Sequence, residues 1–143
     1  MGKLYDTDIV AWASEQAALI RGRQWHSLDI EHIAEEIECV GKQERRELES
    51  RIAVLIGHLL KWKFQPGRRC TNWENIIDAQ RTFVENCLDE APSLRHCLAD
   101  KAWQQRVWNH GYVAATGETG LHDLPRQAMW SADQLRDPEF FPN

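Results

Sequence analysis

Apolar residues recur every three or four positions along most of the chain, which is the period of an amphipathic α-helix. The first such segment runs from a predicted N-cap at Asp6 to Gly22, and the second runs from a predicted N-cap at Asp29 to Gly41. We expect Gly41 to end or kink the second helix, because glycine weakens a helix interior. The apolar stripe of this second helix has 3,4,3 spacing and consists of Ile30, Ile33, Ile37 and Val40.

Residues 42–64 are predicted to form the central helix. Their apolar side chains lie on more than one face, and no helix breaker occurs before the turn at Pro66-Gly67. The portion from Ile52 to Trp62 is therefore expected to be the buried axis of the fold. Gly57 lies in this axis, where glycine costs about 1 kcal/mol relative to alanine, so we expect another helix or an aromatic ring to approach it closely.

Two more helices follow the turn. The fourth begins at Thr71 or Asn72 and ends before Pro92, since a proline disfavours helical backbone in the residue before it. The fifth is expected to be capped by Ser93 and to end near residues 116–117.

Within the fifth helix, Trp103 and Trp108 are five positions apart and do not share one narrow stripe. We expect one of these rings in the core. The other is expected to pack under the C-terminal tail or, alternatively, to meet a partner.

The C-terminal tail, residues 118–143, is predicted to be mostly irregular and to pack on the helices. Ser131 and Gln134 have the spacing of a capping box, which predicts one short helix before Pro138. No alternating strand pattern occurs. The pattern as a whole predicts an all-α chain, a single-domain irregular bundle of about five helices that occupies residues 1–143.

Composition agrees with a folded chain and limits its function. The chain has 143 residues, a hydrophobic fraction of 43% and seven tryptophans, which is enough to bury a core. Its formal net charge of −5 disfavours general nucleic-acid binding. The longest apolar stretch is too short to span a membrane, so we expect no membrane segment. The four cysteines form no CxxC pair, which predicts reduced thiols and a cytoplasmic location.

A polar stripe follows the central helix at intervals of seven, through Glu44, Arg51, His58 and Gln65. Glu47 lies four residues before Arg51, so the favoured interpretation is a row of ion pairs that satisfies itself. The alternative is a His58 with a shifted pKa that takes part in proton transfer.

Asp29 and His32 have the i,i+3 spacing of one arm of a helical dimetal site. No other histidine has an acidic residue three positions before it, so the second arm is missing. We therefore predict no metal and no cofactor, and a solvated acidic face near this helix start.

A basic turn follows the central helix and mixes cations with aromatic residues, a combination able to hold phosphates and stack bases. The alternative is ordinary, because cations favour a helix C-terminus and can pair with surplus acids. The turn contains Lys61, Trp62, Lys63, Phe64, Arg68 and Arg69.

Several blocks of the chain together resemble the bacterial domain of unknown function 29 family. They include "LDIEHIAEEIECVG", "ERREL" at Glu44 to Leu48, "HLLK" at His58 to Lys61, and the Gln80-Arg81 pair. The similarity covers nearly the whole chain. It implies a small, all-helical bacterial protein and carries no established activity, ligand or catalytic residue.

The leading functional hypothesis is a non-enzymatic interaction or regulatory protein. It would bind a protein partner or form a homo-oligomer such as a homodimer, through helical surface and the turn from Lys61 to Arg69. A second alternative uses the same turn, chiefly Arg68 and Arg69, for nucleic-acid binding. No catalytic residue is predicted.

The other alternative is a small enzyme or ligand binder. Its pocket would be lined by Glu36, Arg51, His58, Trp62 and Arg81.

Overall fold

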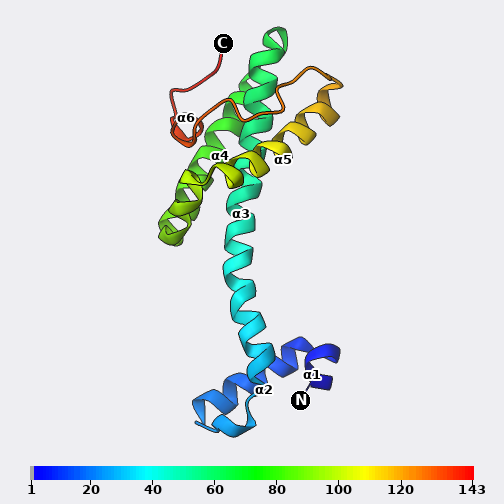
Figure 1. The fold of residues 1–143 in the computed structure, drawn as a ribbon, viewed down its shortest axis with the longest axis vertical. Helices are drawn as coiled ribbons and strands as arrows, with labels where there is room; N and C mark the ends of the chain where they lie inside the picture. Colours follow the sequence, from blue (N-terminus) through cyan, green and yellow to red (C-terminus); the bar gives the residue numbers. More distant parts are fainter. Residues whose placement is uncertain (1) are drawn as a thin grey trace. The chain divides into compact units, whose positions relative to one another are not determined.

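The computed structural model describes residues 2–143, and every regular element in this range is a helix (Figure 1). The all-α prediction is therefore confirmed. The α-helices are α1 (Gly2–Thr7), α2 (Ile9–Arg21), α3 (Ile30–Phe64), α4 (Thr71–Glu90), α5 (Lys101–Thr119) and α6 (Ala132–Arg136). Three 3₁₀-helices connect them, η1 (Trp25–Ser27), η2 (Pro66–Arg68) and η3 (Pro92–Ala99).

Residue contacts divide the chain into two compact units. The first unit is Met1–Gln43 and the second unit is Glu44–Asn143, so helix α3 contributes residues to both. The single domain over residues 1–143 stays a prediction. None of the helices among residues 2–143 is both long and apolar enough to cross a membrane.

The predicted break at Gly41 is wrong, because α3 is one helix of 35 residues that continues through it. Gly41 is exposed, and a Cβ placed there would meet no atom within 4 Å. A single exposed glycine costs a helix only about 1 kcal/mol, and helix kinks arise mainly at prolines or where the hydrogen-bond ladder is interrupted. Neither feature occurs at this position, so the helix continues.

Two other helix starts differ from the sequence prediction. Asp6 lies inside the unpredicted helix α1, and Asp8 caps α2 by accepting a hydrogen bond from the backbone N of Ala11 at 3.0 Å. Ser93 falls in η3 and caps nothing. Helix α5 begins after Asp100, whose Oδ1 accepts from the backbone N of Ala102 at 3.0 Å and thereby satisfies a free amide of the first turn.

Other boundaries agree with the sequence pattern. Helix α3 begins directly after Asp29, and α4 ends before Pro92. The capping box of Ser131 and Gln134 is present at the start of α6.

Helix α5 continues two to three residues beyond its predicted end. It stops at Gly120, whose φ of 74° is a left-handed conformation that glycine adopts without strain.

The core of the second unit forms around residues 48–60 of α3. Leu48, Leu55, Leu59 and Leu60 are fully buried and pack with apolar side chains of α4, η3 and α5. This confirms the prediction of a buried axis for most of the segment that begins at Ile52. Trp62, at the far end of that segment, is only half-buried.

The C-terminal segment packs into this same core. Leu124, Trp130 and Leu135 are buried, and in Figure 1 the segment runs back along the helices of the second unit. The ring of Trp108 lies edge-on to Trp130 with centroids 5.2 Å apart, and Trp108 Nε1 donates to Pro125 O at 2.9 Å. Trp108 therefore packs under the tail.

The other tryptophan of α5 does not meet solvent either. Trp103 is buried and its Nε1 donates to Glu49 Oε1 at 2.9 Å. Both rings are thus internal to the second unit.

Helices α3 and α5 approach closely where two glycines meet. A Cβ at Gly57 would lie 3.5 Å from the carbonyl oxygen of Gly111, so the expected close approach at Gly57 is confirmed. A Cβ at Gly111 would lie 2.7 Å from Ile56 Cγ2 and 2.9 Å from the carbonyl oxygen of Ala53. Of the two positions, Gly111 is therefore the one that requires glycine.

We expect Gly111→Ala to lower the free energy of unfolding of the second unit by about 1–3 kcal/mol, because the new methyl group forces the two helices apart. The matched variant Gly57→Ala adds its methyl group at an ordinary contact distance and gains helix propensity, so it should change stability little. Chemical denaturation monitored by circular dichroism compares them. Equal effects of the two substitutions would contradict the assignment to Gly111.

Candidate functional site

The first unit buries few of its apolar side chains. Among its described residues only Trp12 and Gln16 are buried, with exposed fractions of 4% and 3%. Seven of the eleven large apolar side chains found exposed in residues 4–143 belong to this unit, although it is the shorter of the two. They are Ile9, Val10, Ile20, Trp25, Ile30, Ile37 and Val40. A unit of this size rarely closes a core by itself.

Part of this apolar surface forms a shallow groove between α2 and α3, with a volume of about 270 Å³. We call it the α2–α3 groove. Small side chains of α2 and branched side chains of α3 line this groove. A ligand can therefore approach the backbone of α2 closely and still contact apolar walls. Its apolar lining includes Ala13, Ala17 and Ile20 from α2 and Ile33, Ile37 and Val40 from α3.

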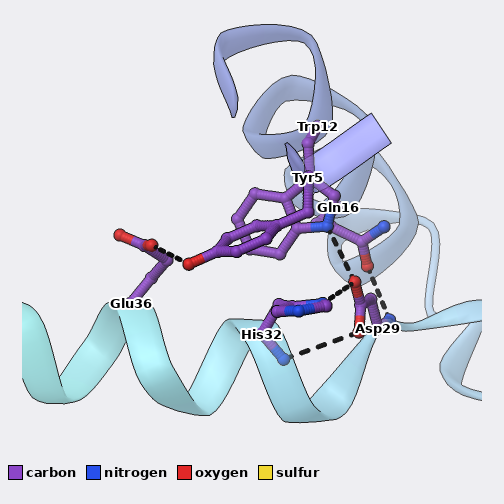
Figure 2. Close-up of polar contacts among 6 residues, drawn as sticks. All are labelled: Tyr5, Trp12, Gln16, Asp29, His32 and Glu36. Carbon is purple, nitrogen blue, oxygen red and sulfur yellow. Dashed lines mark hydrogen bonds and ion pairs between the residues drawn. The ribbon is translucent and has the colours of Figure 1, made fainter. Parts of the chain in front are cut away.

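A polar network stands beside the groove and holds α2 against the start of α3 (Figure 2). Asp29 is its centre: Oδ2 accepts from Trp12 Nε1 at 3.0 Å and from His32 Nδ1 at 2.7 Å. The backbone N of Asp29 donates to Gln16 Oε1 at 2.9 Å. Since Trp12 and Gln16 also line the groove, the network fixes one of its walls.

Helix α1 joins this network through Tyr5. The phenol ring stacks on the imidazole of His32 with centroids 3.9 Å apart and an interplanar angle of 18°. Its hydroxyl donates to Glu36 Oε1 at 2.6 Å, as Figure 2 shows. Glu36 is a further lining residue of the groove, so α1 also supports the α3 wall.

The network shifts the pKa values of its titratable groups. The hydrogen bond to Asp29 raises the pKa of His32, and the acidic side chains of Glu35 and Asp6 add to this effect against the opposing effect of burial. Burial tends to raise the pKa of Asp29, but the hydrogen bonds from His32 and Trp12 outweigh it and lower that pKa. Both shifts favour a charged Asp29–His32 pair.

The pKa of Tyr5 is shifted in the direction that keeps the phenol neutral. Its hydrogen bond to Glu36 is the largest cause and raises the pKa of the phenol to about 12. The hydroxyl therefore remains a hydrogen-bond donor at neutral pH.

The polar atoms of this arrangement bind one another. Both oxygens of Asp29 accept hydrogen bonds, and Nδ1 of His32 is used within the pair. Among the described residues, no group of three histidine, cysteine or acidic side chains is placed to hold a metal ion.

The predicted solvated acidic face is wrong at Asp29, whose side chain is only 9% exposed. Trp12 of α2 donates a hydrogen bond to this carboxylate, and spacing along one helix carries no information on residues that come from another helix.

The network and the core of the second unit both lie within one family match. The family described as Domain of unknown function DUF29 matches residues 4–141. The chain belongs to the DUF29 family. No curated protein and no solved structure shows a significant match to it. The family resemblance seen in the sequence is thereby confirmed, and the function of this DUF29 chain has to be argued from its own surfaces.

The side chains predicted to share one pocket are distributed over both units. Glu36 belongs to the first unit and accepts the hydrogen bond of Tyr5. Arg51 belongs to the second unit, where its Nε lies 2.8 Å from Glu47 Oε1 and its guanidinium lies 4.3 Å from the ring centre of Phe83. The ion pair between Glu47 and Arg51 is the one that the spacing indicates.

His58 is half-buried in the second unit. Its Nδ1 donates to the backbone carbonyl of Val54 at 3.0 Å, and burial is the main cause that lowers its pKa. Burial therefore favours the neutral imidazole, although the hydrogen bond to Val54 acts in the opposite direction, and the ring has a hydrogen-bond partner within its own helix.

Three of the predicted residues do come together around Phe141 of the C-terminal segment. The ring of Trp62 lies 5.1 Å from that of Phe141, and the guanidinium of Arg81 lies 5.4 Å from it. Arg69 stacks over Trp62 at 4.9 Å and donates to the backbone carbonyl of Trp62 at 2.7 Å and to that of Pro142 at 3.4 Å.

Arg81 is buried, and its donors are directed at backbone rather than at a ligand. It donates to the carbonyl oxygens of Leu135 at 2.8 Å, Pro138 at 3.4 Å and Phe140 at 2.7 Å. Burial lowers its pKa. Sequence reasoning missed this role because a carbonyl acceptor leaves no signal in the residue type.

The basic turn is also largely used within the chain. Lys61 forms an ion pair with Glu118, and Lys63 Nζ donates to the carbonyl oxygen of Asn143 at 2.7 Å. Arg69 is bound to the tail, so among the four cations of this turn only the exposed guanidinium of Arg68 has no hydrogen bond or ion pair to another residue within 2–143. The nucleic-acid alternative therefore retains one free cation rather than a patch.

We expect Arg81→Met to lower the free energy of unfolding by about 1–3 kcal/mol, because the buried carbonyl of Leu135 and the partly buried carbonyl of Phe140 lose the donors of Arg81. Amide exchange in residues 132–141 should accelerate most. Arg68→Met is the matched control at an exposed position and should leave both quantities unchanged. Unaltered exchange in Arg81→Met would show that the guanidinium does not hold the tail.

The Asp29–His32 pair predicts a pH dependence for the first unit. A His32 pKa above the ordinary 6.5 in the folded state means that its stabilisation is complete below about pH 6.5 and is lost as pH rises through the folded pKa. The lowered pKa of Asp29 means that its contribution is lost as pH falls from 3.8 through the folded value.

NMR titration of the His32 imidazole checks this directly. We expect a pKa above 6.5 in the native chain and a lower value in Asp29→Asn. A native pKa at or below 6.5 would be inconsistent with the pair.

Proposed function

We propose that this protein is a non-enzymatic, cytoplasmic interaction protein whose α2–α3 groove binds a helix of a partner protein. The supporting observation is the concentration of exposed apolar side chains in the first unit, where seven of eleven occur. Contiguous exposed apolar surface is typical of interaction sites. The second unit, by contrast, buries its own apolar residues in a core.

The groove has the features of a helix-binding surface. Ala13 and Ala17 allow the backbone of a ligand helix to approach α2, while Ile37 and Val40 offer apolar contacts from α3. A ligand helix would supply anchors at i, i+3, i+4 and i+7, the recurring mode of helix-in-groove recognition.

The Asp29 network supports this proposal because it orients the groove before any ligand binds. Trp12, Gln16 and Glu36 each hold a hydrogen bond within the network and also line the groove. A surface that is already ordered loses less conformational entropy on association. The proposal therefore places the partner on the first unit rather than on the turn from Lys61 to Arg69, whose cations are largely occupied.

The cellular setting is part of the proposal. All four cysteines are free thiols, which supports a reducing compartment such as the cytoplasm. The family resemblance supports a bacterial source.

We expect Ile37→Glu to abolish partner binding, because a charge would replace an apolar wall residue that is 67% exposed. Val113→Glu is the matched control: Val113 is 65% exposed on α5 and lies outside the groove. The measurement is native mass spectrometry of each variant after gentle isolation from its own cells. The native chain and Val113→Glu should carry a partner polypeptide, and Ile37→Glu should not.

Two results would contradict this proposal. One is a native chain that carries no polypeptide partner. The other is a partner retained equally by Ile37→Glu, which would place the interaction elsewhere.

A further inference from the structure

The charge of the first unit indicates which kind of helix the groove accepts. Residues 1–43 contain eight acidic and four basic side chains, so this unit holds a net charge of −4 out of the −5 of the whole chain. The acids are Asp6, Asp8, Glu15, Asp29, Glu31, Glu35, Glu36 and Glu38. With histidine counted as neutral, the apolar groove therefore belongs to a unit of net negative charge.

The acidic side chains are concentrated on the helix that forms one groove wall. Between Ile30 and Gly41, α3 has four glutamates and neither lysine nor arginine. Glu36 lines the groove itself, and Glu31, Glu35 and Glu38 are exposed. Glu31, Glu35 and Glu38 do not line the groove, so they act on a bound ligand through the long-range field of the unit, which is strongest at low salt.

On this basis, and resting on the proposed function, we propose that the partner helix is basic and amphipathic, with an apolar stripe flanked by lysine or arginine. The stripe fills the α2–α3 groove, and the cations on either side of the stripe are attracted by the negative field of the first unit. Complementary charge of this kind accelerates association and excludes ligands of the wrong sign.

The same charge argues against two other occupants. A second copy of this chain would bring another first unit with a net charge of −4 to the groove, and like charges oppose that pairing. An anionic lipid surface would be repelled for the same reason. A basic protein helix satisfies both the apolar and the electrostatic features of the surface.

Two synthetic helical peptides test the proposal. Both carry leucine at identical i, i+3, i+4, i+7 positions, and the remaining positions are lysine in one and glutamate in the other. We expect the basic peptide to bind the full-length chain at least about tenfold more tightly at low salt, with an advantage that shrinks as salt is raised. Isothermal titration calorimetry measures affinity, and NMR shift changes in residues 9–40 locate the site.

Charge variants separate electrostatic selection from the apolar contact. The triple variant Glu31→Gln, Glu35→Gln, Glu38→Gln should lose most of the preference for the basic peptide and leave the apolar groove unchanged. The matched control neutralises three exposed glutamates of the second unit, Glu74→Gln, Glu90→Gln and Glu139→Gln, and should keep the preference.

Each other outcome has a distinct meaning. If the acidic peptide binds as tightly as the basic one, the charge inference is wrong while helix binding in the groove stands. If neither peptide shifts residues 9–40, the proposed function itself fails. A homodimer that Ile37→Glu dissociates would assign the groove to a second copy and overturn the inference.

Discussion

Helix α3 supplies a packing surface to both units, so its continuity is the constraint on which the other elements depend. Its residues 48–60 present fully buried leucines to the core of the second unit. Its first turns supply Glu36 and His32, which hold Tyr5 of α1 by a hydrogen bond and by ring stacking. Asp29, directly before α3, accepts a hydrogen bond from Trp12 of α2. The exposed Gly41 between these regions weakens the helix only slightly, so one element serves both purposes.

The two units are stabilised by different kinds of interaction. The second unit relies on burial of apolar side chains, with α3 and α5 in contact at Gly111. The first unit relies on a network centred on one carboxylate, which fixes positions but buries few apolar side chains. Hydrogen bonds give directional order with a modest net gain in stability, whereas apolar burial provides the main driving force of folding. An ordered unit with exposed apolar surface is therefore suited to association.

Two arginines of the second unit bind the backbone of the C-terminal segment and pair with no carboxylate among the described residues. Arg81 and Arg69 donate to carbonyl oxygens of the C-terminal segment, and their guanidinium groups stack on Phe141 and Trp62. The planar guanidinium suits such a task, because it has several donors in fixed directions and also stacks on rings. A cluster of arginines and aromatic rings thus serves tail packing, and its composition by itself resembles a ligand site.

The sequence alone determined the helical class, most helix boundaries, the buried segment of α3 and the Glu47–Arg51 pair, because these depend on period, capping and spacing within a few residues. It also marked Gly57 as a close contact. Only the tertiary structure decided that Trp12 binds Asp29 and that Tyr5 stacks on His32. It also decided that Arg81 holds the tail and that Gly111 is the position without space for a side chain. These features join residues distant in sequence, so no local pattern encodes them. The α2–α3 groove also depends on tertiary structure. The apolar stripe of each helix can be recognised in its sequence, but which of these side chains remain exposed depends on what the rest of the chain covers.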